Sequence, residues 1–180
     1  PAGRMGTLSG MMLDPAIFKA YDVRGIVPDQ FDPDGAYRVA RAYVEVFQAK
    51  NIAIGHDMRL SSPALADAAI RGATDGGANV AVLGEIGTEM LYFAVADGGL
   101  DGGIIVTASH NPAEYNGMKI VRAEAQPVGS ASGLNEVKKL ATGPAELPAV
   151  ATPGVATPLD VLPAYADKML GLIDVPALRP

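Results

Sequence analysis

The 180-residue chain contains no cysteine, which excludes disulfides, iron–sulfur clusters, thiolate zinc sites and a cysteine nucleophile. It has only two histidines, His56 and His110, so a histidine-rich metal site is not expected. Its longest apolar run is the seven residues 90–96, whereas a membrane-spanning helix needs about 20. The sequence therefore predicts no membrane partner.

Positive charge is also scarce, because 14 basic residues face 20 acidic ones and leave a net charge of −6. Nucleic-acid binding proteins present a basic face, so nucleic acid is not an expected partner. Neither a GxGxxG dinucleotide loop nor a Walker phosphate loop occurs, and nucleotide binding has no sequence support. With 49% apolar and 19% charged residues, the composition predicts a folded, soluble, cytoplasmic protein.

The two ends of the chain differ from its middle. Residues 1–13 lack the continuous apolar core of a secretion signal and are predicted to form a tail. Residues 143–163 contain five prolines and no aromatic, which is typical of a linker. Apolar residues then recur at helical spacing over 159–170. Such a helix either packs back on the first domain or begins a second one, and we favour a chain cut before that second domain. The predicted division is a tail at 1–13, a domain at 14–142, and a linker and helix at 143–180.

Helix-like and strand-like segments alternate from residue 16 to residue 122. The predicted strands are 17–21, 51–55, 79–83, 103–107 and 118–122. Asp32 before Pro33, and Ser62 before Pro63, are typical helix starts, and Thr88 is the predicted cap of a third helix. These helices are long enough for crossover connections. The pattern predicts a three-layer α/β/α fold with a mostly parallel mixed sheet.

Ligands of such sheets bind at the carboxyl ends of the strands, which here are followed by loops 21–30, 55–62 and 107–117. The third loop, beginning ThrAlaSerHisAsnPro, offers Ser109 and His110 at its tip. A surface turn is an equally good interpretation from composition alone. A Ser–His hydrolase dyad is not expected, since adjacent side chains rarely meet and no third member is evident. An exposed serine that accepts a phosphoryl group fits the loop better.

Four cationic side chains are predicted in these loops, and they are expected to converge: Arg24, Arg59, His110 and Lys119. Each alone is more easily explained as a solvated loop charge. Together they would form a local positive patch on an acidic protein, which suits a small phosphorylated ligand better than a polyanion.

Three segments carry a family resemblance: IFKAYDVRG at 17–25, GHDMRLSSP at 55–63 and TASHNPAEYNGMK at 107–119. The chain resembles the N-terminal domain of the α-D-phosphohexomutases, and within them the bacterial phosphomannomutase/phosphoglucomutase branch. The resemblance covers roughly residues 15–122, and the third segment is its most specific motif.

The resemblance implies that Ser109 is the phosphorylated serine. It would pass its phosphoryl group to a hexose 1- or 6-phosphate, giving a 1,6-bisphosphate that reorients and returns the other phosphoryl group. A phosphoserine oxygen of Ser109 would also bind Mg²⁺, with hexose 1,6-bisphosphate as activator. His110, Lys119 and Arg24 would be the other catalytic residues. Tyr21, Arg59 and Asn111 would bind the hexose phosphate substrate.

The family's acidic DxDxD-type magnesium loop is absent from this sequence. The remaining ligands are therefore expected in an absent second domain, and the chain by itself is expected to be inactive and to self-associate through uncovered surfaces. Two alternatives stay open: a stand-alone module that binds sugar phosphates or a regulatory partner, and a phosphoglucosamine mutase.

Overall fold

The structure, a computed structural model, describes residues 13–144, 147–148, 150–174 and 177–178. Apart from Leu13, the predicted tail lies outside these residues. Leu13 itself is buried in the core. None of the helices in the described ranges is long and apolar enough to cross a bilayer.

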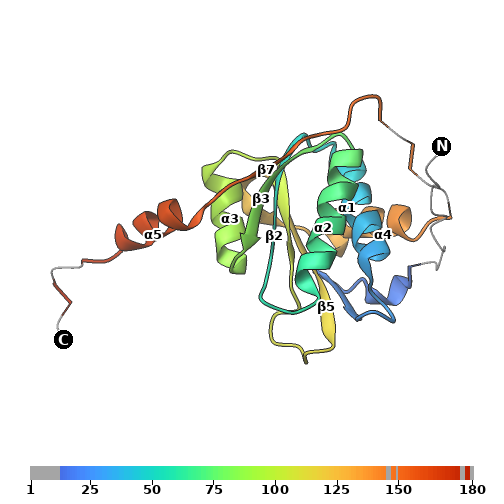
Figure 1. Cartoon of the computed structure of the whole chain (residues 1–180), viewed down its shortest axis with the longest axis horizontal. Helices are drawn as coiled ribbons and strands as arrows, with labels where there is room; N and C mark the ends of the chain where they lie inside the picture. Colours follow the sequence, from blue (N-terminus) through green and yellow to red (C-terminus); the bar gives the residue numbers. More distant parts are fainter. Residues whose placement is uncertain (1–12, 145–146, 149, 175–176, 179–180) are drawn as a thin grey trace, which may run out of the picture.

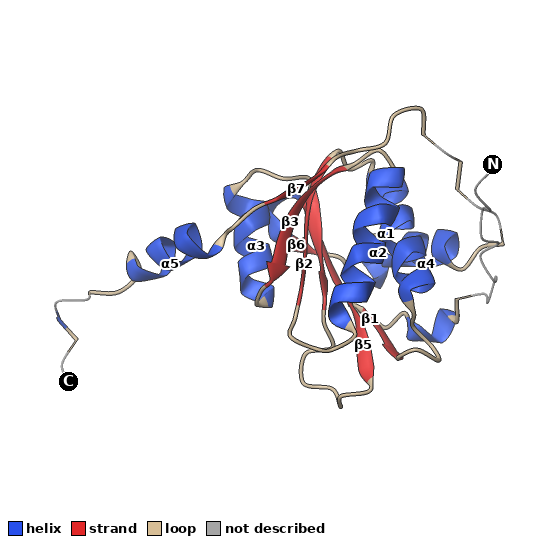
Figure 2. Ribbon diagram, viewed as in Figure 1, coloured by secondary structure: helices blue, strands red, loops and turns tan. Residues whose placement is uncertain are grey.

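One mixed sheet organises the molecule (Figures 1 and 2). Its strands are β1 (Val23–Ile26), β2 (Asn51–His56), β3 (Asn79–Glu85), β4 (Gly102–Val106), β5 (Tyr115–Arg122), β6 (Gln126–Pro127) and β7 (Ala156–Pro158). The order is β1-β5-β4-β2-β3-β7, with β6 paired to β5. Only β5 runs against the others, because its pairs with β1, β4 and β6 are antiparallel and the remaining pairs are parallel. The sheet is therefore mostly parallel, as predicted.

Helices cover both faces of the sheet, which confirms the predicted three-layer fold (Figure 2). On one face lie α1 (Pro33–Phe47), α2 (Ser62–Asp75) and α4 (Leu134–Ala141), and on the other lies α3 (Thr88–Asp97). A last helix, α5 (Leu162–Leu170), follows β7 in the chain. Alternate residues of each strand point to opposite faces. Ile104 thus packs in the core under α1, α2 and α4, whereas its neighbour Ile105 packs against α3.

The residues predicted to cap the helices do so in one case of the three. Asp32 caps α1 as predicted, since its carboxylate accepts the Gly35 N–H at 2.8 Å. Thr88 does not cap α3, because Gly87 holds the cap position and Thr88 is the first helical residue. Ser62 is likewise inside α2, and its hydroxyl donates to Asp57 instead of capping. The Ser62 hydroxyl, expected to cap the helix backbone, thus bonds to a carboxylate that the tertiary fold brings close.

Several segments differ from their predicted form. The predicted strand 17–21 is a 3₁₀ turn (Pro15–Ile17) followed by a single bridge from Phe18 to Val23. Helix α4 and strands β1 and β6 were not predicted at all. The predicted linker contributes β7, an edge strand parallel to β3. Strands β6 and β7 have only two and three residues, which is too few to show a strand periodicity.

The last helix, α5, projects from one end of the molecule (Figure 1). Its Tyr165 ring packs edge-on against Phe93 of α3, with ring centroids 5.6 Å apart. Leu162 and Leu170 remain 58% and 54% exposed. The helix thus packs against α3 through Tyr165, while most of its apolar side chains are exposed within the described residues.

Candidate active site around Ser109

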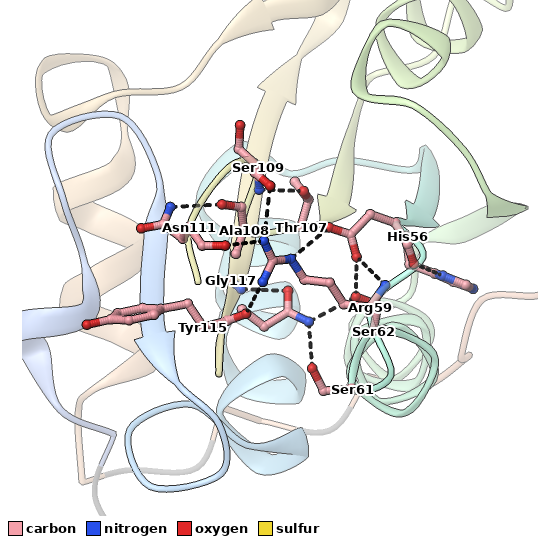
Figure 3. Close-up of polar contacts among 12 residues, drawn as sticks. His56, Arg59, Ser61, Ser62, Thr107, Ala108, Ser109, Asn111, Tyr115 and Gly117 are labelled. Atoms are coloured by element: carbon pink, nitrogen blue, oxygen red, sulfur yellow. Dashed lines mark hydrogen bonds and ion pairs between the residues drawn. The ribbon is translucent and has the colours of Figure 1, made fainter. Parts of the chain in front are cut away.

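Two connections meet at the carboxyl edge of the sheet, one after β2 and one after β4 (Figure 3). Ser109 lies in the second, is exposed, and adopts the left-handed conformation with φ 54°. That conformation costs a non-glycine residue roughly 1–2 kcal/mol. It also brings the Ser109 Oγ to 3.2 Å from His110 Nδ1, although adjacent side chains were not expected to meet. No carboxylate within the described part of the chain contacts the His110 ring, so a hydrolase triad is still not formed.

Arg59 reaches across from the β2 connection into the serine loop. Its guanidinium donates four hydrogen bonds to backbone carbonyls of this loop, at Ser109 (3.0 Å), Asn111 (2.6 Å), Pro112 (2.7 Å) and Tyr115 (3.0 Å). Its Nε lies 3.4 Å from a carboxylate oxygen of Asp57. Of the five N–H donors of an arginine side chain, four make these hydrogen bonds, and the fifth, at Nε, faces Asp57 in an ion pair. Arg59 therefore ties the two connections together.

Asp57 receives several donors at the end of β2. The Ser62 hydroxyl donates to it at 2.5 Å and the Arg59 backbone N–H at 3.1 Å. The Thr107 hydroxyl also contributes to lowering the pKa of Asp57. Burial by itself raises the pKa of Asp57, but these hydrogen bonds and the Arg59 charge outweigh it, so the pKa lies below the ordinary value. Asp57 is ionised at neutral pH.

Asn116 supports this network from β5 and is completely buried. Its side-chain amide donates to the hydroxyls of Ser61 (2.8 Å) and Ser62 (2.9 Å), and its carbonyl accepts the Gly117 N–H. The start of α2 is thereby fixed to the strand that follows the serine loop. Both the side-chain amide and the side-chain carbonyl of Asn116 therefore have hydrogen-bond partners, as a buried polar group requires.

A second cluster of charges lies beside the serine loop, on the α3 face of the sheet. Arg24 was predicted in a loop but lies in β1. Lys119, counted with the loop cations although it falls in the predicted strand 118–122, lies in β5. Asp22 joins them: one of its oxygens is 3.1 Å from Arg24 Nη2 and 3.9 Å from Lys119 Nζ. Arg24 also donates to the backbone carbonyl of Thr107, two residues before Ser109. Burial lowers the pKa of Arg24, and the Asp22 carboxylate opposes that shift.

The other two predicted site residues have different surroundings. The Tyr21 side chain is 77% exposed and its ring lies over Gly129, where a Cβ would come within 2.9 Å of the ring. Asn111 folds back on its own turn, donating from its side chain to the Ala108 carbonyl at 2.8 Å. No direct contact joins Tyr21 to the serine loop within the described residues. The roles assigned to both residues stay predictions.

Four residues of these networks were not predicted as site residues from the sequence: Asp22, Asp57, Thr107 and Asn116. The available signal was spacing, since each aspartate stands two residues before a predicted site arginine. In an extended segment, residues two apart lie on the same face. Asn116, by contrast, gives no local signal, because its partners lie more than 50 residues away.

A cleft of about 830 Å³ opens beside Ser109. It is lined by both connections and by the start of α3, and its lining includes Met58, Leu60, Thr107, Ser109 and Glu114. Met58 and Leu60 are highly exposed apolar side chains, at 77% and 103%. The space is ample for a small ligand that reaches the Ser109 hydroxyl.

The donor set does not fit a magnesium site on its own. No group of three acidic or histidine side chains suited to a metal occurs in the described ranges. The nearby carboxylates of Asp22 and Asp57 are paired with Arg24 and Arg59. Ser109 is left as one possible oxygen ligand, whereas Mg²⁺ requires six ligands in octahedral geometry.

Comparisons with known proteins agree with one another. A family model described as phosphoglucomutase/phosphomannomutase, alpha/beta/alpha domain I, matches residues 15–146. A phosphomannomutase of Salmonella typhimurium is 44% identical over 165 residues, which make up 91% of this chain and 36% of that protein. A phosphomannomutase of Klebsiella pneumoniae is 45% identical over 152 residues, 83% of this chain and 96% of that protein.

Solved structures give the same result. The crystal structure of a phosphoglucomutase/phosphomannomutase family protein from Burkholderia thailandensis superposes with a TM-score of 0.78 at 29% identity. The match covers 89% of this chain and 36% of that one, so the chain spans about a third of the length of the Salmonella and Burkholderia relatives. On sequence and fold together, the chain belongs to the phosphoglucomutase/phosphomannomutase family and corresponds to its α/β/α domain I.

Proposed function

We propose that this chain forms the phosphoserine-bearing wall of a hexose-phosphate mutase that interconverts mannose or glucose 1- and 6-phosphates. The observation that carries the proposal is Ser109 itself. It is an exposed hydroxyl on a strained turn at the carboxyl edge of the sheet, with His110 at 3.2 Å and the cleft beside it. Relatives that share this domain bear the name phosphomannomutase.

In the proposed reaction, phosphorylated Ser109 transfers its phosphoryl group to the free hydroxyl of a hexose phosphate. The P–Oγ bond breaks and a P–O bond to the sugar forms, while the proton lost by the sugar hydroxyl ends on Oγ of Ser109. The resulting hexose 1,6-bisphosphate reorients and returns its other phosphoryl group to Ser109, whose Oγ proton passes to the sugar oxygen that leaves. His110 Nδ1, 3.2 Å from Oγ, relays this proton in both transfers.

Arg24 and Lys119 supply the positive charge of the proposed site. Phosphoryl transfer depends chiefly on positioning and on stabilising the charge of the transferring group. Arg24 bonds to the Thr107 carbonyl close to the serine turn, and Asp22 holds Lys119 on the same face of the sheet. A magnesium ion, as the family resemblance implies, would need ligands besides Ser109.

The test uses the enzyme at the length of its relatives. After incubation with glucose 1,6-bisphosphate and Mg²⁺, intact mass should rise by one phosphoryl group, and peptide mapping should place it on Ser109. Ser109→Ala should abolish both the mass increase and the formation of 6-phosphates from mannose 1- and glucose 1-phosphate. Phosphate on Ser61 or Ser62 would contradict the assignment of the phosphoserine to Ser109. If glucosamine 1-phosphate were the one substrate turned over, the proposed substrate would be glucosamine phosphate instead of mannose or glucose phosphate.

A further inference from the structure

We propose that Asp57, Arg59 and Thr107, hereafter the Asp57 clamp, are positioning residues that hold the backbone of Ser109 on both sides for phosphoryl transfer. The inference rests on the proposed function. It assigns Arg59 a role different from the substrate binding predicted from sequence, and it gives Asp57 and Thr107 a role that sequence did not indicate.

The clamp has two arms, one at the Ser109 N–H and one at the Ser109 carbonyl (Figure 3). In the first arm, Thr107 Oγ1 accepts the Ser109 N–H at 2.9 Å. In the second arm, Arg59 Nε faces Asp57 at 3.4 Å, and Arg59 Nη2 donates to the Ser109 carbonyl at 3.0 Å. Both backbone polar groups of Ser109 are thereby held by side chains.

The backbone of Ser109 needs such a clamp, because its left-handed conformation, with φ 54°, persists only while the surroundings stabilise it. If an arm is lost, the residue is free to relax toward negative φ, which turns the hydroxyl away from its present position. Alignment of the reacting atoms contributes a large part of the rate in phosphoryl transfer. A small rotation of this turn is therefore expected to lower turnover strongly.

The existing contacts of the Arg59 guanidinium distinguish a positioning role from direct substrate binding. Four of its five N–H donors bond to loop carbonyls, and the fifth, at Nε, faces the Asp57 carboxylate in an ion pair. A substrate phosphate could bind Arg59 only by displacing one of these partners. Lysine keeps the charge but has a single donor group at one point, so it cannot span four carbonyls.

Asp57 is suited to anchor the Arg59 arm. It stays charged at neutral pH, and the Ser62 hydroxyl holds it from the first turn of α2 at 2.5 Å. Ser62 is in turn fixed by the buried amide of Asn116. The anchor is thus connected to a helix and a strand, which makes it stiffer than the loop it holds.

Two variants of the full-length enzyme test the arms separately, Thr107→Val and Arg59→Lys. Thr107→Val keeps the side-chain shape and removes the hydroxyl. The matched control is Arg71→Lys, on the exposed side of α2 and outside the site. We expect each arm variant to lower kcat at least 30-fold with KM within threefold, and the control to stay within twofold. A role in folding alone would lower the melting temperature without this split between kcat and KM.

A second readout needs no activity. Hydrogen exchange of the Ser109 amide should accelerate at least tenfold in Thr107→Val, because Thr107 Oγ1 is its acceptor. If the unaltered enzyme takes up no phosphate, the proposed function fails, and exchange alone decides whether the clamp exists. If phosphate is taken up but either arm variant turns over normally, the clamp is refuted. A raised KM with unchanged kcat in Arg59→Lys would restore the substrate-binding assignment.

Discussion

Asp22 is the residue whose removal tests the charge cluster most directly. It lies 3.1 Å from the buried Arg24 guanidinium and 3.9 Å from Lys119, so Asp22→Asn leaves two cations without their shared carboxylate. Asparagine has nearly the same shape and still offers one oxygen to Arg24. The substitution therefore removes charge with little change in packing.

The expected loss of stability follows from opposing terms. With an effective dielectric constant of about 20, the Coulomb attraction is roughly 5 kcal/mol to Arg24 and roughly 4 kcal/mol to Lys119. Desolvation of the buried ions offsets most of this, and breaking a buried pair costs about 3–5 kcal/mol. Arg24 keeps the carbonyls of Val23 and Thr107 as acceptors, which reduces the loss. We expect a net destabilisation of about 2 kcal/mol, or a fall in melting temperature of about 4–8 °C.

Urea unfolding of the chain at pH 7 measures the change. The matched control is Asp67→Asn, the same substitution at an exposed position of α2, which should stay within about 0.5 kcal/mol of the unaltered chain. In 0.5 M NaCl most of the Asp22 effect should persist, since partly buried pairs are screened weakly. Equal stability of the two variants, or an effect that disappears in salt, would refute the view that Asp22 holds a buried cation.

Three further predictions concern packing, pH and catalysis. Gly72→Ala in α2 should destabilise the chain by about 1–3 kcal/mol although alanine favours helix, because its Cβ would lie 2.2 Å from the Tyr37 carbonyl oxygen; a more stable variant in urea would contradict this. The pKa of Asp57 lies below its unfolded value, so its contribution is present above about pH 4 and lost as the pH falls further. Unfolding of Asp57→Asn between pH 6 and pH 3 should therefore depend less on pH than unfolding of the unaltered chain. Lys119→Ala in the proposed full-length mutase should lower turnover about a hundredfold. It should lower the free energy of unfolding by no more than about 1 kcal/mol, because the ion pair with Asp22 is 3.9 Å long and the Lys119 side chain is one-third exposed. Normal turnover would show that Lys119 has no role in the site.

Local chemistry determined much of this protein. The alternation of helical and strand periodicity predicted the layers, Asp32 and Pro33 predicted the start of α1, and the residues around Ser109 predicted the family. Each of these signals lies within a short stretch of chain. Propensity, capping and binary patterning act over the same range, so they are visible in the sequence.

Tertiary structure decided the rest. The linker contains β7 because β3 offered an unpaired edge, and the Ser62 hydroxyl went to Asp57 because folding brought that carboxylate within 2.5 Å. Arg59 could be recognised from sequence as a cation near the site. Its engagement with four carbonyls of a loop about 50 residues away could not be recognised, because hydrogen-bond partners across a sheet edge depend on register and crossover. Sequence thus determined which groups the site contains, and the fold determined which of them are already satisfied by one another.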